Sequence, residues 1–154
     1  MVKARKYQEQ FDRLKRWYGR FEKIDQGRPH TVASDYYIDE IYAFFINCYH
    51  LKDWIQNDET VRLPQGKIEH FVHQNECMRV CKDICNGIKH LKRKSYSGGD
   101  PEFGPRKFSL DLGEPTTIIK VKYSIITKTG TIDAFQLASE CLQRWKEFIK
   151  RNII

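Results

Sequence analysis

The segment 34–56 is apolar over more than one helical face, and this feature constrains the fold more than any other. Its main apolar stripe recurs every three or four residues, as an α-helix requires. Further apolar side chains flank that stripe, so a single neighbouring helix would leave much of it in water. We therefore expect this helix at the centre of a bundle. The main stripe comprises Tyr37, Ile41, Phe44, Cys48, Leu51 and Ile55, and the flanking residues are Ile38, Tyr42, Phe45 and Tyr49.

Three other long segments have the same helical period. Residues 3–25, 75–92 and 134–151 each carry a continuous apolar stripe, and a shorter helix is expected around residues 67–73. Gly27 and Pro29 mark the end of the first helix, while Asn75 and Asp133 are suitable N-caps for the last two. These segments predict helices that share one core.

The spacing of apolar residues changes from a helical pattern to a strand pattern after residue 105. Residues 107–112 and 117–127 alternate or are β-branched, and Lys128, Thr129 and Gly130 provide a tight turn. The segment before them, 93–105, is rich in glycine, proline and serine, as loops are. The predicted fold class is mainly α: a four- to five-helix bundle with a β-hairpin inserted before the last helix. Residues 1–154 are expected to form a single domain.

The cysteines are five in number and none lies in a CxxC pair. All five fall within helical apolar patterns, which favours reduced core thiols. Cys77, Cys81 and Cys85 are four residues apart, with His70 and His73 shortly before them. A helix rises about 12 Å over eight residues, so Cys77 and Cys85 cannot share an ion whose bonds are about 2.3 Å long. We expect no metal site and no cofactor.

The chain carries a net charge of +7, unevenly distributed. Residues 29–60 hold one basic and six acidic side chains, between basic neighbouring segments. Charge complementarity within the molecule is one explanation, and a phosphate-binding surface is another. The densest basic run, a candidate binding site, is Lys89, Lys92, Arg93 and Lys94. No run of 18 apolar residues exists and the N-terminal segment is charged throughout, so we expect a cytoplasmic protein that does not enter a membrane.

Two polar pairs interrupt the apolar helices. Asn86 and His90 are four residues apart, and His50 and Asp53 are three apart, so each pair lies on one side of its helix. If the two helices are antiparallel neighbours, the pairs meet in a shared cleft. Alternatively, Asp53 pairs with a lysine or arginine of a basic neighbouring segment, and His50 is a half-buried histidine whose hydrogen bonds are satisfied. Gly87, between Asn86 and His90, marks either a close helix approach or a surface-facing helix end.

The three tryptophans also lie on helical stripes. An indole in such a position usually packs in the core or at an interface. We therefore interpret Trp17, Trp54 and Trp145 as packing residues.

The order of elements, together with the sequence DICNGIKHLK, resembles the HEPN superfamily. Bundles of this superfamily often act as metal-independent ribonucleases in toxin, antitoxin and antiviral systems. Their motif is an arginine, usually followed by a polar residue, and a histidine four to six residues beyond the arginine. Asn86 and His90 match the polar residue and the histidine, and Cys85 occupies the arginine position.

The substitution at position 85 bears directly on activity. RNA cleavage of this type needs proton transfer, for which His90 is suited, and a cation that stabilises the phosphorane. Cys85 cannot supply that cation, and Lys89 would be a poorer substitute than arginine. We expect a non-catalytic or weakly active module that binds RNA or a protein, including a second copy of the chain as a homodimer. The alternative is a metal-independent endoribonuclease that uses Asn86 and His90.

Overall fold

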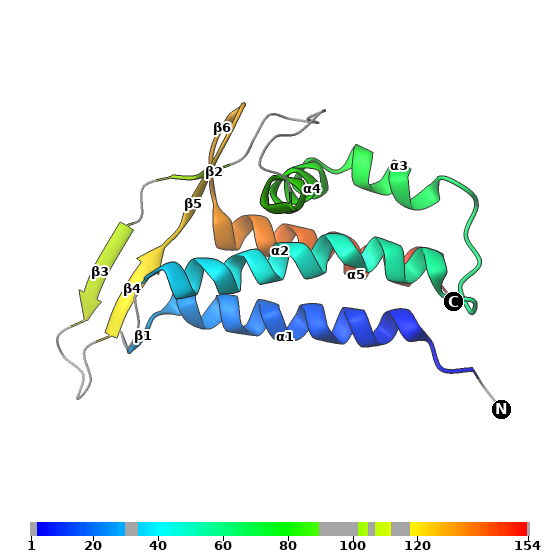
Figure 1. Cartoon of the computed structure of the whole chain (residues 1–154), viewed down its shortest axis with the longest axis horizontal. Coiled ribbons are helices and arrows are strands. Elements are labelled where there is room, and N and C mark those ends of the chain that lie inside the picture. The colour runs from blue at the N-terminus through cyan, green and yellow to red at the C-terminus, as the bar shows by residue number, and fades with distance from the viewer. Residues whose placement is uncertain (1–2, 30–33, 90–101, 105–106, 112–117, 154) are drawn as a thin grey trace.

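Five helices dominate the computed structural model, which describes residues 3–29, 34–89, 102–104, 107–111 and 118–153 (Figure 1). The predicted bundle and its β-hairpin are confirmed. Helix ends agree with the sequence to within a few residues where both ends are described. The helices are α1 (Lys6–Gln26), α2 (Ser34–Asn57), α3 (Lys67–Gln74), α4 (Glu76–Lys89) and α5 (Ala134–Asn152).

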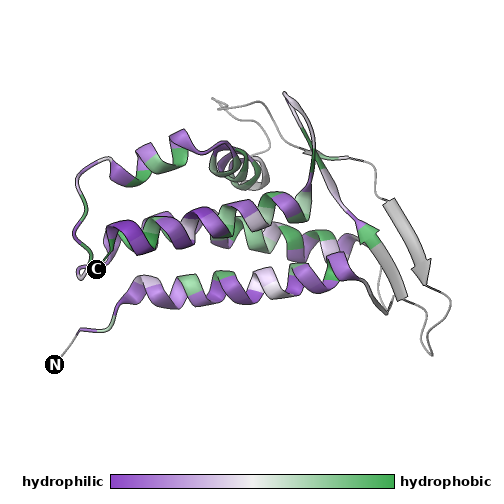
Figure 2. Ribbon diagram, turned by 180° about the vertical axis from the view of Figure 1, so that it is seen from behind, coloured by the Kyte–Doolittle hydropathy of each residue, from purple (hydrophilic) through white to green (hydrophobic). Residues whose placement is uncertain are grey.

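The helix α2 occupies the predicted central place. It packs against α1, α4 and α5, and its whole predicted stripe from Tyr37 to Ile55 is buried. Helices α1 and α2 run side by side in opposite directions, whereas α4 is seen nearly end-on in the same view and so crosses α2 steeply (Figure 1). Polar and apolar positions alternate along α1 and α5, as amphipathic helices require (Figure 2).

Trp145 of α5 fixes the contact between α5 and α2. Its side chain is fully buried, and the indole Nε1–H donates a 3.0 Å hydrogen bond to the Cys48 carbonyl of α2. The Phe71 ring of α3 lies 4.8 Å from the Trp145 ring, centroid to centroid. The interpretation of Trp145 as a packing residue is therefore confirmed.

Two small antiparallel sheets lie at the end of the bundle opposite both chain termini (Figure 1). One sheet has the order β1-β4-β3 and the other β2-β5-β6. β5 and β6 form the predicted hairpin, with Thr127 opposite Gly130 across the turn. The sequence did not predict the short strand β1, which pairs with β4, or the short strand β2, which pairs with β5. The strands are β1 (Arg28–Pro29), β2 (Glu102–Phe103), β3 (Lys107–Asp111), β4 (Ile118–Lys122), β5 (Ser124–Thr127) and β6 (Gly130–Asp133).

Helix ends follow the predicted capping residues. Gly27 closes α1 with a φ of 98°, and the Asp133 carboxylate accepts a hydrogen bond from the Gln136 backbone N–H at the start of α5. Asn75 separates α3 from α4, but its amide donates to the Phe71 carbonyl rather than capping α4 with its side chain. The Asn75 side chain therefore satisfies a carbonyl of the preceding helix.

Asp58 caps α1 from a distant part of the chain. The residue before α1, Arg5, makes no side-chain cap, and the Asp58 carboxylate accepts a 2.9 Å hydrogen bond from the Tyr7 backbone N–H. Its other oxygen accepts from the backbone and hydroxyl of Thr60. Asp58 is 4% exposed, so this carboxylate joins the start of α1 to the loop after α2 inside the protein.

No helix in the described part of the chain is both long and apolar enough to cross a membrane.

Replacing Asp58 with alanine should lower the free energy of unfolding by about 1–2 kcal/mol, the usual cost of removing a helix cap. Burial raises the pKa of Asp58, but the hydrogen bonds from Tyr7 and Thr60 outweigh it and lower the pKa below its usual value. This stabilisation is therefore present above the unfolded pKa of about 4 and lost as the pH falls through the folded value. Urea denaturation at pH 7 and an acid titration followed by circular dichroism measure both effects.

The matched control is Asp53→Asn, which changes an exposed carboxylate on α2. It should leave the urea midpoint almost unchanged. Equal losses for the two variants would contradict the capping role of Asp58.

Candidate functional site

The described residues of the predicted site, His50, Asp53 and Asn86, come from α2 and α4, which pack against each other. The Cys81 thiol of α4 donates a 3.4 Å hydrogen bond to the Phe45 carbonyl of α2. One turn further along each helix, Cys85 lies near Tyr49. Burial raises the pKa of the Tyr49 phenol, and the Asp53 carboxylate and the Cys85 thiol act in the same direction. The two helices are neighbours, but their steep crossing differs from the antiparallel arrangement considered in the sequence analysis (Figure 1).

The described structure does not join the two predicted polar pairs. His50 and Asp53 are exposed and Asn86 is half-buried, and no hydrogen bond among the described residues connects them. Asp53 instead lies 3.3 Å from the ammonium of Lys52, the adjacent residue of its own helix, and not beside a cation of a neighbouring basic segment. His50 is exposed rather than half-buried, which corrects the alternative interpretation of that residue.

The remaining predicted site residues cannot be compared with the structure. His90, Lys92, Arg93 and Lys94 lie outside the described residues, as does the side chain of Lys89, the last residue of α4. The shared cleft and the basic run therefore stay predictions.

Gly87 is exposed, which supports the surface interpretation of this glycine over a close helix contact.

Cys85 lies in the helix interface, not on an open surface. It is 7% exposed, and its electrostatic effect on the pKa of Tyr49 places it on the side of α4 that faces α2. An arginine at this position would have to place its guanidinium at the crossing of α4 and α2. In the HEPN superfamily, which the sequence resembles, the motif arginine occupies this position. Here a buried thiol occupies it instead.

Asp83 is a buried acid that the sequence analysis did not single out. It is 1% exposed, and it precedes Asn86 by three residues and position 90 by seven. Positions spaced by three and seven residues lie on the same side of a helix. The three-residue spacing between Asp83 and Asn86 is the sequence signal that could have identified it. However, an aspartate among lysine and arginine residues resembles an ordinary solvent-exposed charge.

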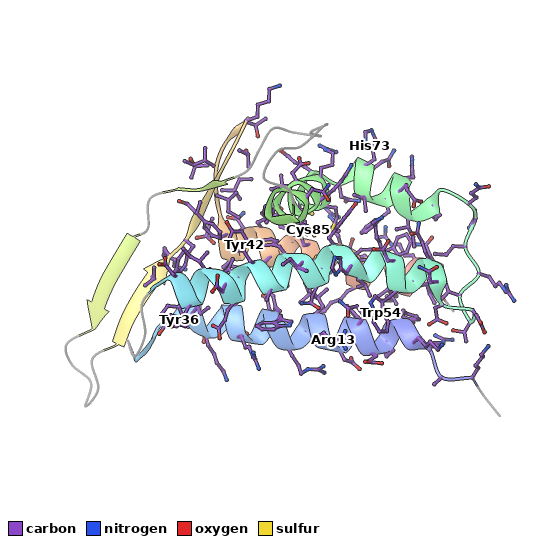
Figure 3. All side chains as sticks on the ribbon, in the orientation of Figure 1. Arg13, Tyr36, Tyr42, Trp54, His73 and Cys85 are labelled. Carbon is purple, nitrogen blue, oxygen red and sulfur yellow. The ribbon has the colours of Figure 1, made fainter. Side chains whose placement is uncertain are left out.

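A basic and aromatic surface follows the boundary between α1 and α2. The Arg13 guanidinium lies 5.6 Å from the ring centroid of Trp54, and the Arg20 guanidinium lies 4.6 Å from that of Trp17. Both tryptophans are only partly buried. Arg13 and Trp54 face each other across the two helices in Figure 3. Both distances lie within the range of cation–π interactions.

Further cations adjoin this boundary. Arg16, Arg20 and Lys23 recur at the spacing that places them on one exposed side of α1, over about 10 Å of helix. None of the three has an acidic side chain within 4 Å among the described residues. We call the following set the basic–aromatic seam: Arg13, Arg16, Trp17, Arg20, Lys23 and Trp54.

Three of the four acidic residues of α1 pair with cations, and the fourth, Glu22, accepts a 3.3 Å hydrogen bond from the Gln26 amide. Glu9 pairs with Arg13 at 3.0 Å and Asp12 with Lys15 at 2.7 Å. Asp25 pairs with Lys122 of β4 at 2.5 Å. The exposed side of α1 therefore keeps a local excess of positive charge.

A second basic surface lies between α3 and α5. It is a groove of about 300 Å³ whose cations are Lys67, Arg144 and Arg151, and Phe71 and Phe148 also line it. Arg144 is paired with Glu147 at 3.3 Å, and no cation–π contact occurs among the described residues of this groove. The groove therefore has basic and aromatic residues but lacks the cation–π contacts of the seam.

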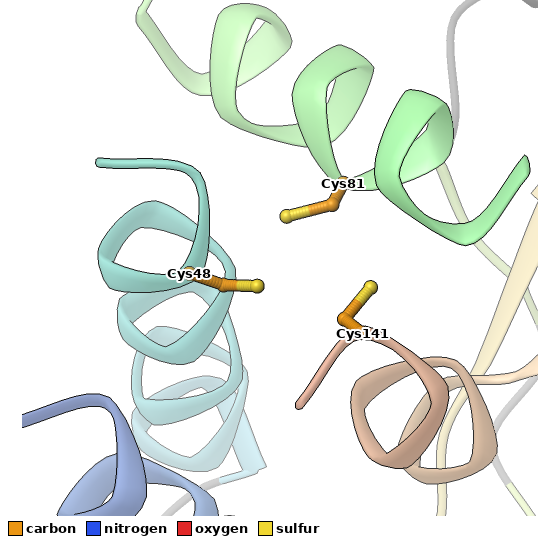
Figure 4. A group of neighbouring side chains, drawn as sticks. All are labelled: Cys48, Cys81 and Cys141. Carbon is orange, nitrogen blue, oxygen red and sulfur yellow. The ribbon is translucent and has the colours of Figure 1, made fainter. Parts of the chain in front are cut away.

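Three cysteines from three helices converge in the core. Cys48 of α2, Cys81 of α4 and Cys141 of α5 have their sulfur atoms within 4.8 Å of one another, and all three side chains are 0% exposed (Figure 4). All five cysteines are free and buried, so the prediction of reduced core thiols is confirmed. The sequence spacing could not reveal this cluster because its members are 33 and 60 residues apart along the chain.

The three thiols influence one another's ionisation. Burial raises the pKa of Cys48, but hydrogen bonds from Cys141, Cys81 and the Trp145 indole outweigh it and lower the pKa to about 5. Burial raises the pKa values of Cys81 and Cys141 well above the usual range. Negative charge in this cluster is therefore best placed on the Cys48 sulfur.

Comparison with protein-family models, with curated proteins and with solved structures finds no match to this chain.

Arginine at position 85 should destabilise the protein without creating an active site. Overfilling a packed core typically costs about 1–3 kcal/mol, and Cys85 lies between α4 and α2. We expect Cys85→Arg to unfold at lower urea concentration and to show no gain in RNA cleavage. Denaturation curves and gel assays of a labelled RNA without added metal measure the two effects.

Gly87→Arg is the control because it adds the same charge at an exposed position of α4. It should be neutral or stabilising, since glycine costs about 1 kcal/mol within a helix. A Cys85→Arg variant that keeps its stability and cleaves RNA faster than the unmodified chain would overturn our account of position 85.

Proposed function

We propose that this chain is an RNA-binding helical module of the HEPN-like type that holds single-stranded RNA on the basic–aromatic seam and does not cleave it rapidly. The observation that carries the proposal is the pair of arginine–tryptophan cation–π contacts, Arg13 with Trp54 and Arg20 with Trp17, beside cations that have no acidic partner among the described residues. Proteins that bind single strands combine positive charge along the backbone with planar groups on which bases stack.

The seam provides both components at suitable spacing. Arg16, Arg20 and Lys23 project from one side of α1 and can contact successive phosphates. The guanidinium groups of Arg13 and Arg20 can stack on unpaired bases. Because the cation–π contacts already restrict these two side chains in the free protein, less side-chain entropy is lost when RNA binds.

The expectation of weak or absent cleavage rests on position 85. Cys85 places no positive charge beside Asn86, and a lost stabilising contact to the phosphorane costs about a hundredfold to a thousandfold in rate. In keeping with the resemblance, we extend the proposal to a role in a toxin, antitoxin or antiviral system, where such a module would hold RNA or a partner.

The alternative is the metal-independent ribonuclease. Buried Asp83 favours it, because Asp83 and Asn86 share one side of α4 and the seven-residue spacing from Asp83 predicts the same side for position 90, which lies outside the described residues. A carboxylate on that side could orient His90 for proton transfer. RNA integrity is therefore measured alongside RNA binding in the tests below.

Removing the three exposed cations of α1 should weaken RNA binding at least tenfold. The variant is Arg16→Gln/Arg20→Gln/Lys23→Gln, and the probe is a fluorescently labelled oligouridine followed by anisotropy. The slope of log K against log salt should fall in magnitude by about 2, because each phosphate contact to a single strand contributes about 0.7.

A matched variant removes three cations from α5, Arg144→Gln/Lys150→Gln/Arg151→Gln. We expect it to retain most of the affinity, and a larger loss there than on α1 would move the binding site to the groove between α3 and α5. If the unmodified chain shows no measurable binding of the oligouridine, the proposal is refuted. Rapid metal-independent cleavage that His90→Ala abolishes would establish the ribonuclease instead.

Replacing Trp54 with leucine should weaken oligouridine binding about fivefold or more, because it removes the support of a guanidinium that stacks on a base, and such stacking contributes about 1–3 kcal/mol. Leucine keeps apolar packing at this half-buried position. Tyr36→Leu, which removes an exposed aromatic at the other end of α2, is the control and should bind normally. Equal affinities for both variants would show that Trp54 plays no part in RNA binding.

A further inference from the structure

We propose that Cys48, Cys81 and Cys141 form a three-coordinate thiolate site for the soft monovalent ion Cu(I). The site lies where α2, α4 and α5 meet, and it is separate from the basic–aromatic seam. This inference does not depend on RNA binding.

The geometry of the three sulfurs supports the site. All three point into the same space from different helices and lie within 4.8 Å of one another (Figure 4). An ion bound at about 2.3 Å, the usual metal–thiolate distance, holds three sulfurs about 4 Å apart when it lies in their plane. The helices therefore already hold the ligands close to the spacing that the ion needs.

The backbone contacts restrict the directions of these side chains. Cys81 and Cys141 donate through sulfur to the carbonyls of Phe45 and Cys77, at 3.4 and 3.3 Å. The Cys48 carbonyl accepts from the Trp145 indole at 3.0 Å. The two thiol hydrogen bonds must be given up when sulfur coordinates as thiolate, but the surrounding helices remain in place.

The donor set selects the kind of ion. Thiolates favour soft ions such as Cu(I) and also bind zinc. Structural zinc is almost always four-coordinate, and no fourth His, Cys, Asp or Glu in the described part of the chain shares the mutual distance of these three sulfurs. Since each side chain is 0% exposed, water is also poorly placed to fill a fourth position. Three-coordinate Cu(I) fits this enclosed set of sulfurs better than zinc.

Binding is a simple exchange of protons for metal. Cu(I) forms bonds to the sulfurs, each sulfur that coordinates as thiolate releases its proton to solvent, and no oxidation state changes. The bound ion would link α2, α4 and α5, so it stabilises the folded state by mass action. The earlier argument that Cys77 and Cys85 cannot share an ion still holds, because this site takes only Cys81 from α4.

The test is competition for Cu(I) with a chromophoric chelator, using reduced full-length protein without oxygen. The unmodified chain should withdraw one equivalent of Cu(I) and unfold at a higher temperature when loaded. Cys48→Ala, Cys81→Ala and Cys141→Ala should each bind Cu(I) at least tenfold more weakly. Cys85→Ala, which changes a buried cysteine one turn from Cys81 and outside the cluster, should bind as the unmodified chain does.

Circular dichroism confirms that each variant is folded before its affinity is compared. A second loading, by refolding the unmodified chain from urea with Cu(I) present, removes any barrier to entry into the core. Failure to withdraw Cu(I) by either route overturns the proposal, whatever the variants do. Undiminished binding by folded cluster variants, or stoichiometric Zn(II) binding without Cu(I) binding, also overturns it.

Discussion

Burial of α2 on several sides is the constraint on which the rest of the structure depends. Its apolar surface is too wide for one partner, so α1, α4 and α5 must each cover part of it. The Trp145 indole anchors α5 to the Cys48 carbonyl, and Cys81 of α4 reaches the Phe45 carbonyl. The same convergence brings three thiols together, so the cysteine cluster is a direct consequence of the central helix.

The packing of α2 also determines which surfaces are free for function. Helix α1 covers α2 with one side only, which leaves its other side in water along its length. Partly buried Trp17 and Trp54 lie at the edge of this contact and make cation–π contacts with Arg20 and Arg13. The surface proposed for RNA binding thus lies along the contact between two long helices.

The sequence predicted features that depend on local pattern. The stripe of α2, the caps at Gly27 and Asp133 and the turn before β6 are all encoded within a few residues. Features that depend on the crossing of distant helices were missed. Spacing along α1 could have suggested its cations, but nothing in the sequence pairs Arg13 with Trp54, joins Asp58 to Tyr7, or unites three cysteines from three helices.

The most direct test of the central claim is an NMR titration of the isotopically labelled chain with single-stranded RNA. The account predicts that backbone shifts concentrate on residues 13–23 and that the Trp17 and Trp54 indole N–H signals move. The Trp145 indole signal should stay in place, because that N–H is buried and bonded to the Cys48 carbonyl. Shifts confined to the groove between α3 and α5, or no shifts at all, would contradict the account.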